Sequence, residues 1–126
     1  EWSYGARNLY PNGNMLPQLV AMRVFPSEIP VVGSGDDMYA RLPVGTYQIE
    51  GNVQTYEITI DSLPQAACIK VGQVFTPTSN HRLLKVSVNG KDFDAKRAGV
   101  FDGFQQKLIA ECSPNGNINK LAWTFR

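Results

Sequence analysis

The alternation of apolar and polar residues predicts β-strands over much of this chain. In the clearest case, Tyr56, Ile58 and Ile60 alternate with Glu57 and Thr59. A period of two places the apolar side chains on one face of a strand and the polar ones on the other. We therefore expect a sheet with one buried face and one face in contact with water.

Turn residues predict hairpins on both sides of this strand. Pro43-Val44-Gly45 separates two short strands within 38–50, and a connection of this length is typical of a hairpin. Asn89-Gly90 ends an alternating stretch that contains Leu84, Val86 and Val88. This dipeptide is a strong hairpin signal, so we expect a short return strand over 91–93.

The stretch 117–125 predicts the last strand, in which Leu121, Trp123 and Phe125 alternate with polar or small residues. We expect this strand to lie in the centre of the sheet, because it carries the largest apolar side chains near the C-terminus. We expect Trp123 to fill the core. The alternative is a small pocket lined by aromatic side chains, namely Tyr39, Tyr47, Tyr56 and Trp123.

Apolar residues at helical spacing predict two helices in the first part of the chain. Asn14 can cap the first helix, over 15–23. Ser62 and Gln65 have the spacing of a capping box, which predicts the start of the second helix, and Gly72 would end it in the left-handed conformation. Residues 26–37 contain prolines, glycines and an acidic pair and predict an irregular loop. Trp2, Tyr4 and Tyr10 precede the turn signal Pro11-Asn12-Gly13.

A third helical pattern ends at the second of the two cysteines, with apolar positions at Phe101, Phe104, Leu108 and Cys112. Cys68 lies on the apolar stripe of the second helix, so both cysteines face inward and favour a disulfide. On the chain-entropy model such a bridge stabilises the fold by about 4 kcal/mol. The alternative is two independent buried thiols, since free cysteine packs as a small hydrophobe. A disulfide would imply an oxidising compartment.

Together these elements predict a single α+β domain over 1–126, with a mainly antiparallel sheet and its helices packed on one face. The 43% content of hydrophobic residues supports a folded globule. The net charge of +1, with both signs scattered along the chain, argues against a nucleic-acid-binding or membrane-surface protein. No apolar run reaches the length of a membrane span.

No combination of residues predicts catalysis or a cofactor site. His81 is the only histidine and lies in a polar loop, where a solvated role is favoured over that of a general base. Asp36-Asp37 lacks the alternating oxygen ligands of a calcium loop, and zinc would need more histidine and cysteine ligands. Gly33-Ser34-Gly35 lacks the strand and helix that flank a phosphate-binding loop. We therefore expect a non-enzymatic protein that works through its surfaces.

The order of these parts resembles the globular head of a type IVb pilin, the kind found in toxin-coregulated, bundle-forming and thin conjugative pili. The resemblance covers residues 15–126 and implies a pilin-like α/β-roll with one disulfide. It rests on these motifs in this order: Phe25-Pro26-Ser27-Glu28, Tyr56-Glu57-Ile58-Thr59-Ile60, Ser62-Leu63-Pro64, Ala66-Ala67-Cys68, Val88-Asn89-Gly90, Cys112 and a closing apolar strand.

In that family the two cysteines bound a segment called the D-region, which faces outward and mediates subunit contacts and adhesion. Carried over, this role falls on residues 68–112. Within them we take a mixed group of charges as the candidate subunit or adhesion surface, namely Lys91, Asp92, Asp94, Lys96 and Arg97. The family also has a long apolar N-terminal helix that anchors the precursor in the inner membrane. The chain begins at Glu1, so we expect that helix upstream, with 1–14 as its end or the segment after it.

The resemblance implies a major or minor structural subunit of a type IV pilus, with a role in adhesion, aggregation or conjugative contact. Its expected partners are other pilin subunits in a homo-oligomeric filament, the pilus assembly machinery and a receptor on a host cell or bacterium. We expect it in the inner membrane and periplasm before assembly and in the extracellular pilus afterwards. An alternative of another class is a secreted ligand-binding or inhibitor domain with one disulfide.

Overall fold

The structure is a computed structural model that describes residues 10–23, 26 and 28–126. Its elements in chain order are β1 (Tyr10–Asn14), α1 (Leu16–Ala21), β2 (Val31–Val32), the 3-10 helix η2 (Gly35–Asp37), β3 (Tyr39–Arg41), β4 (Thr46–Val53), β5 (Thr55–Leu63), α2 (Gln65–Val71), β6 (Leu83–Val88), β7 (Lys91–Asp94), α3 (Phe104–Glu111) and β8 (Asn119–Phe125).

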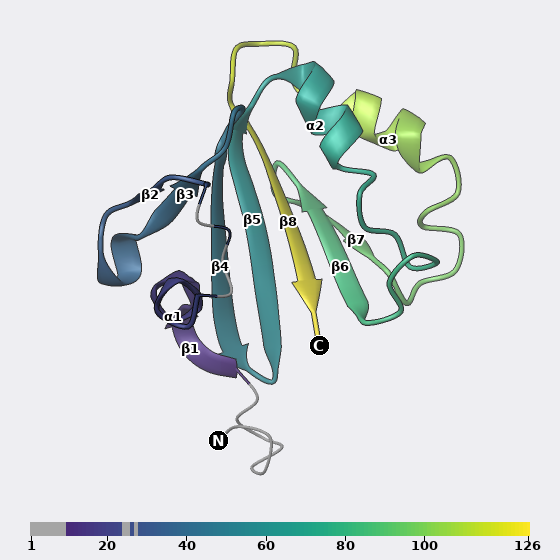
Figure 1. Ribbon diagram of the computed structural model, residues 1–126. Helices are drawn as coiled ribbons and strands as arrows, with labels where there is room; N and C mark the ends of the chain where they lie inside the picture. The colour runs from purple at the N-terminus through teal and green to yellow at the C-terminus, as the bar shows by residue number, and fades with distance from the viewer. Residues whose placement is uncertain (1–9, 24–25, 27) are drawn as a thin grey trace.

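The eight strands form one sheet in which every described pair is antiparallel. The strand order is β2-β3-β4-β5-β8-β6-β7, and β1 pairs with the end of β4 that β3 leaves open. In Figure 1, α1 lies beside β4 and next to β1, whereas α2 and α3 lie side by side at the other half of the sheet. The predicted α+β fold, with a mainly antiparallel sheet, is confirmed.

The cross-strand register aligns one apolar row across the sheet. Ile49 lies opposite Ile58, Ile58 opposite Trp123, Trp123 opposite Val86, and Val86 opposite Phe93. Residues directly opposite in an antiparallel pair point to the same face. The row therefore runs from β4 to β7 on one face, and this is the face that the helices cover.

Two clusters of buried side chains form the core. Trp123, Leu121 and Cys68 belong to the larger one, which packs beneath α2 and α3, and Leu16 of α1 belongs to the smaller one. Ile58 packs against both clusters, so β5 joins the two halves of the core. Trp123 is only 1% exposed, which confirms that it fills the core.

The predicted strands and hairpins agree well with the structure. The hairpins at 43–45 and at Asn89-Gly90 connect β3 to β4 and β6 to β7. The last strand lies between β5 and β6, which confirms its predicted central position. In β6 the register shifts between Leu83 and Lys85, so Leu83, rather than Leu84, is fully buried.

Three predictions about the ends of the elements are wrong. Pro11-Asn12-Gly13 belongs to β1 instead of a turn, and residues 26–37 contain β2 and η2 as well as loop. The first helix is shorter than predicted and ends at Ala21, although the Asn14 carboxamide oxygen does accept a hydrogen bond from the backbone N–H of Leu16 at 2.9 Å. Trp2, Tyr4, Val24, Phe25 and Ser27 lie outside the described residues.

Gly72 ends α2 for a different reason from the one the sequence indicates. Its φ is −60°, so the predicted left-handed stop is wrong. A Cβ at this position would lie 2.8 Å from a methyl carbon of Leu108 on α3. Glycine therefore allows α2 and α3 to pack closely.

The predicted capping box at Ser62 is also wrong, although the helix that follows it exists. Pro64 occupies the N-cap position of α2, no side chain caps the helix, and Ser62 lies in β5 with a φ of 63°. The register of β5 against β8 shifts between Ile60 and Leu63, and Ser62 takes the left-handed conformation at this irregularity.

We predict that Ser62→Gly raises the free energy of unfolding by about 0.5–1 kcal/mol. An L-residue pays a steric cost in the left-handed region that glycine avoids, and this exceeds the entropic cost of glycine. Ser62→Ala is the matched control, because it keeps the Cβ and should leave stability nearly unchanged. Urea denaturation measures both variants. A loss of stability of about 1 kcal/mol in both would instead indicate a lost helix cap.

Candidate functional site: the disulfide-bounded segment

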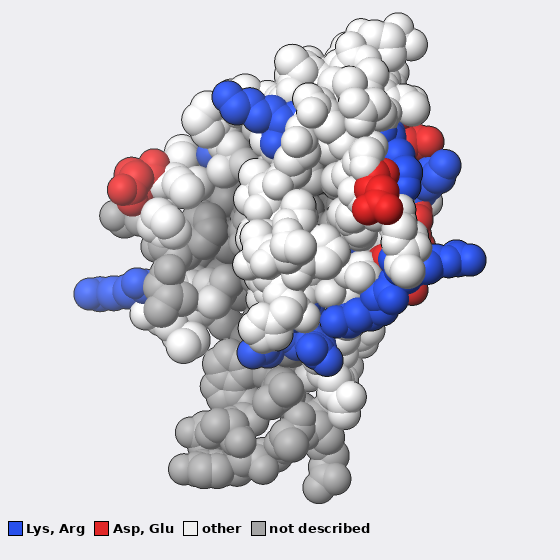
Figure 2. Space-filling model, turned by 90° about the vertical axis from the view of Figure 1, so that its right-hand side faces the viewer, with Lys and Arg blue, Asp and Glu red and all other residues white. Residues whose placement is uncertain are grey.

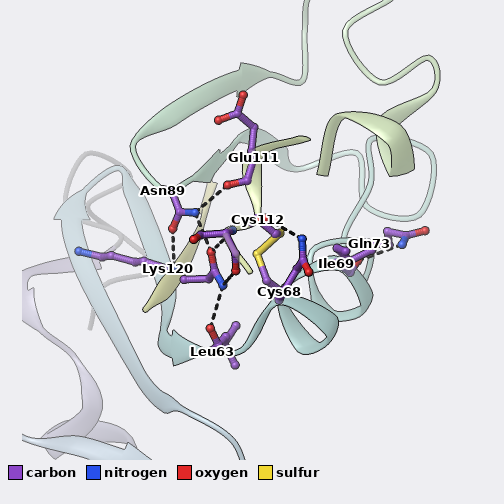
Figure 3. Close-up of a disulfide and its surroundings, with 11 residues drawn as sticks. Leu63, Cys68, Ile69, Gln73, Asn89, Glu111, Cys112 and Lys120 are labelled. Atoms are coloured by element: carbon purple, nitrogen blue, oxygen red, sulfur yellow. Dashed lines mark hydrogen bonds between the residues drawn. A yellow bond between two sulfur atoms is a disulfide. The ribbon is translucent and has the colours of Figure 1, made fainter. Parts of the chain in front are cut away.

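A disulfide joins the two helices that lie side by side on the sheet. Cys68 lies in α2 and Cys112 directly follows α3, with their Cα atoms 6.0 Å apart (Figure 3). Both residues are buried, with exposed fractions of 0% and 2%. The disulfide hypothesis is confirmed, and the alternative of two free thiols is wrong.

Three side-chain amides hold the chain where α3 ends. Asn89 donates to the carbonyl of Glu111 at 2.9 Å, Gln65 to that of Cys112 at 3.1 Å, and Asn119 to that of Ser113 at 3.0 Å. The last carbonyls of a helix have no partner within the helix and need one from elsewhere. These amides come from β6–β7, α2 and β8, so they fix the end of α3 to three other parts of the fold.

Asn119 is the one fully buried polar residue in the described part of the chain. Its amide nitrogen also donates to the Leu63 carbonyl at 3.0 Å, while its oxygen accepts from the Ser113 backbone at 2.6 Å and from the Asn89 side chain at 2.9 Å. A carboxamide offers two donor hydrogens and two acceptor lone pairs. All four are used, so the residue can be buried without an unmet polar group.

Asn89 has a second role beyond the hairpin turn that the sequence predicts. Its φ of 52° suits the turn. Its side-chain oxygen accepts from the backbone N–H of Lys120 at 2.8 Å, and its own N–H donates to the Lys120 carbonyl at 2.9 Å (Figure 3). The hairpin is therefore anchored to β8 as well as to α3.

The five candidate surface residues lie together at one edge of the sheet. Lys91, Asp92 and Asp94 belong to β7, the outermost strand, and Lys96 and Arg97 follow it. All five are exposed. We call this group the β7 edge surface.

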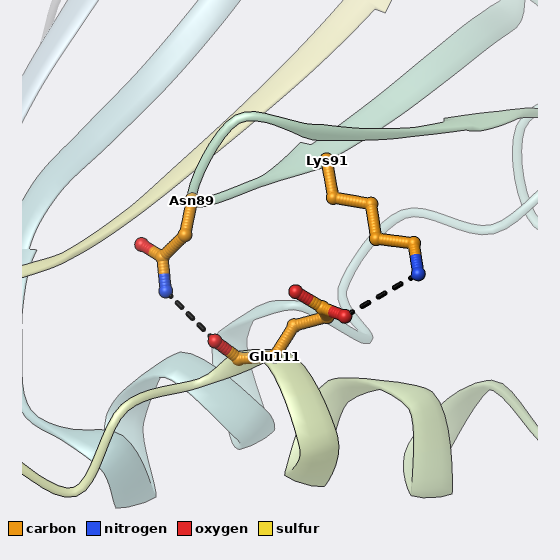
Figure 4. Close-up of polar contacts among 3 residues, drawn as sticks. All are labelled: Asn89, Lys91 and Glu111. Carbon is orange, nitrogen blue, oxygen red and sulfur yellow. Dashed lines mark hydrogen bonds and ion pairs between the residues drawn. The ribbon is translucent and has the colours of Figure 1, made fainter.

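Two exposed ion pairs hold side chains of this edge in place. The Lys91 ammonium lies 3.4 Å from the Glu111 carboxylate (Figure 4) and 5.9 Å from the centre of the Phe93 ring, and Lys85 pairs with Asp92 at 3.8 Å. Such exposed pairs contribute little to stability. Charged side chains on an edge strand do, however, oppose pairing with a strand of another molecule.

The turn after β7 is ordered by Asp94. Its carboxylate accepts from the backbone N–H of Lys96 at 2.8 Å, and its carbonyl accepts from that of Arg97 at 3.2 Å. The Lys96 ammonium approaches the carbonyl of His81 at 3.4 Å. His81 lies exposed in a loop, as the sequence predicts. Figure 2 shows that positive and negative side chains are mixed on this side of the molecule.

Neither a metal-binding cluster nor a membrane-spanning helix is found within the described residues. No group of three or more His, Cys, Asp or Glu side chains could hold a metal ion there. No helix in 10–23 or 28–126 has the length and apolar character that a membrane crossing needs. Burial, and to a lesser extent the neighbouring Tyr56, raises the pKa of Tyr47. Tyr47 is partly buried against the smaller core cluster, which accounts for this shift.

A comparison with known protein families shows which family this chain belongs to. The family model described as "PilS N terminal" matches residues 3–126. The chain belongs to the PilS family of type IVb pilins. No curated protein and no solved structure matches it. The resemblance drawn from the order of the motifs is therefore confirmed, and PilS-family membership makes this chain a pilin, a structural class that is typically non-enzymatic.

We predict that Asn119→Ala lowers the free energy of unfolding of this pilin by about 3 kcal/mol. The substitution leaves the Leu63 carbonyl, Ser113 and Asn89 without their buried partner, and such unmet groups are costly. Asn117→Ala is the matched control, since Asn117 is exposed. Urea denaturation of both variants measures the difference. Equal stability of the two would show that the buried amide contributes nothing.

We predict that replacing both cysteines, Cys68→Ser with Cys112→Ser, lowers stability by about 2–4 kcal/mol under oxidising conditions. Thermal melting with and without a reductant measures this effect. Reductant should lower the melting temperature of the wild-type domain and leave that of the variant unchanged. An unchanged wild-type melting temperature on full reduction would contradict the prediction.

Proposed function

We propose that this PilS-family chain assembles with copies of itself into a type IVb pilus filament, and that residues 68–112 supply an outward contact surface of the subunit. The observation that carries this proposal is the β7 edge surface. Its charged side chains point outward, while Asn89 and the disulfide hold the hairpin and α3 behind it in a fixed position. A preorganised surface loses little entropy when it binds.

The proposed surface is suited to binding rather than chemistry. Its groups are exposed lysine, arginine and aspartate side chains. Lys91 and Asp92 form ion pairs with residues outside the group, and Asp94 orders the turn that follows. Groups of this kind give specificity and register to a contact between proteins. We infer that residues 68–112 act as the D-region of this pilin.

The filament would act outside the cell, in adhesion, aggregation or conjugative contact with a host or bacterial surface. We infer that the subunit passes through the inner membrane and periplasm and is handed to the pilus assembly machinery. The secreted-domain alternative has no specific support, since Trp123 is buried and Tyr56 stacks on Phe125 with ring centres 5.1 Å apart. Trp123 and Tyr56 therefore both pack with the larger core cluster.

Electron microscopy with gold-labelled antibody against this domain tests the proposal. Cells that produce the full-length protein should carry filaments labelled along their length if the chain is the major subunit, or at the tip if it is a minor one. Cells in which the gene is deleted should lose the labelled filaments. Labelled protein that is secreted but never filamentous would contradict the proposal.

We predict that Lys91→Glu reduces the number of filaments while leaving the fold intact. The exposed pair with Glu111 contributes less than about 1 kcal/mol, so the melting temperature of the purified domain should change little. Arg41→Glu is the matched control, because Arg41 is an exposed cation on β3 that lies outside residues 68–112. Normal filament numbers in the Lys91 variant would exclude this residue from the subunit contact.

A further inference from the structure

The sheet face opposite the helices carries a row of charges. Glu50 lies opposite Glu57, Glu57 opposite Thr124, Thr124 opposite Lys85, and Lys85 opposite Asp94. These residues alternate along their strands with the apolar row, so they point to the other face. No described helix covers this face, since the helices pack with the apolar row.

A hollow of about 440 Å³ lies on this face. Glu50, Glu57, Lys85 and Thr124 line it, together with residues of β1 and the ends of β4 and β5 that meet at their hairpin. Gly13 and Gly51, which lie opposite each other, also line it.

The hollow carries an uncompensated negative charge. The directly opposed Glu50 and Glu57 are like charges, an arrangement that destabilises a sheet. Lys85, the cation that lines the hollow, forms its ion pair with Asp92. In the described part of the chain neither glutamate forms an ion pair. A cation supplied from outside would therefore relieve the repulsion, and we call this site the acidic hollow.

The chain also presents two cations that fit such a site. Lys96 and Arg97 lie in the turn after β7, which Asp94 orders through two backbone hydrogen bonds. Both are exposed, and among the described residues no carboxylate forms an ion pair with either. We call this pair the basic turn.

One copy cannot bring these two surfaces together. Glu57 and Asp94 lie in the same row but are separated by β8 and β6. At about 4.8 Å between neighbouring strands, three steps span about 14 Å, and the basic turn follows the end of β7. Its Lys96 ammonium lies near the carbonyl of His81, and within the described residues neither Lys96 nor Arg97 forms an ion pair with Glu50 or Glu57.

We propose that the basic turn of one copy binds the acidic hollow of the next copy, an inference that rests on the proposed assembly into a filament. The contact joins two different surfaces. In a pair of copies, one acidic hollow and one basic turn therefore stay unoccupied, and each can bind a further copy. Contacts of this head-to-tail type extend into a helical filament when they do not close into a ring. Charge complementarity fixes which surfaces meet and in which register.

Charge reversal in cells that produce the full-length pilin tests this contact. One variant reverses the basic turn with Lys96→Glu and Arg97→Glu, a second reverses the hollow with Glu50→Lys and Glu57→Lys, and a third combines all four changes. The control, Arg23→Glu with Arg41→Glu, applies the same change in charge at exposed cations outside residues 68–112. Filaments are counted by electron microscopy, and melting of each purified domain reports folding.

We expect the first two variants to lose most filaments, and the combined variant and the control to retain them. Wild-type filaments in either of the first two variants would overturn the contact. So would a folded combined variant without filaments. If the hollow variant does not fold, Glu50→Gln with Glu57→Gln removes the charge without reversing it and should also lose filaments. Absence of filaments from wild-type cells would overturn the proposed function itself.

Discussion

The fold depends above all on how the chain is held where α3 meets the sheet. The buried Asn119 satisfies all of its hydrogen bonds there, and the disulfide joins α2 to the end of α3 beside it. A buried polar group stabilises a structure only in the single arrangement that meets its bonds. The two interactions therefore act together: the covalent bond limits the distance between the helices, and the amide fixes their position on the sheet.

Much of the fold could be predicted because period-two patterns and hairpin turns act locally. The alternating strand at 56–60, the turn at Asn89-Gly90 and the inward-facing positions of the two cysteines follow from short-range patterns in the sequence. The central position of the last strand was predicted from its large apolar side chains. The ends of elements were harder, since tertiary contacts decide them. Ser62 takes a left-handed conformation at a shift in strand register, and Gly72 is required by the approach of Leu108.

The site was predictable only in part. The charges between the two cysteines indicated a surface, and the structure gathers them at one edge. Asn119 and Gln65 carry no sequence signal for their roles, because their partners lie 56 and 47 residues away. The acidic hollow could not be predicted either, since the opposition of Glu50 and Glu57 arises from the pairing of β4 with β5.

The central position of β8 has a consequence for how the molecule is made. β5 and β6, the strands on either side of β8 in the sheet, both precede β8 in the chain. They do not pair with each other, so β8 connects the two parts of the sheet. Without β8 the chain forms two separate parts of the sheet. β5 and β6 then each expose an unpaired edge where β8 will later lie, and unpaired edges invite aggregation. Both cysteines precede β8 in the chain, so a disulfide that forms before β8 pairs would hold the two halves near each other until this strand joins them.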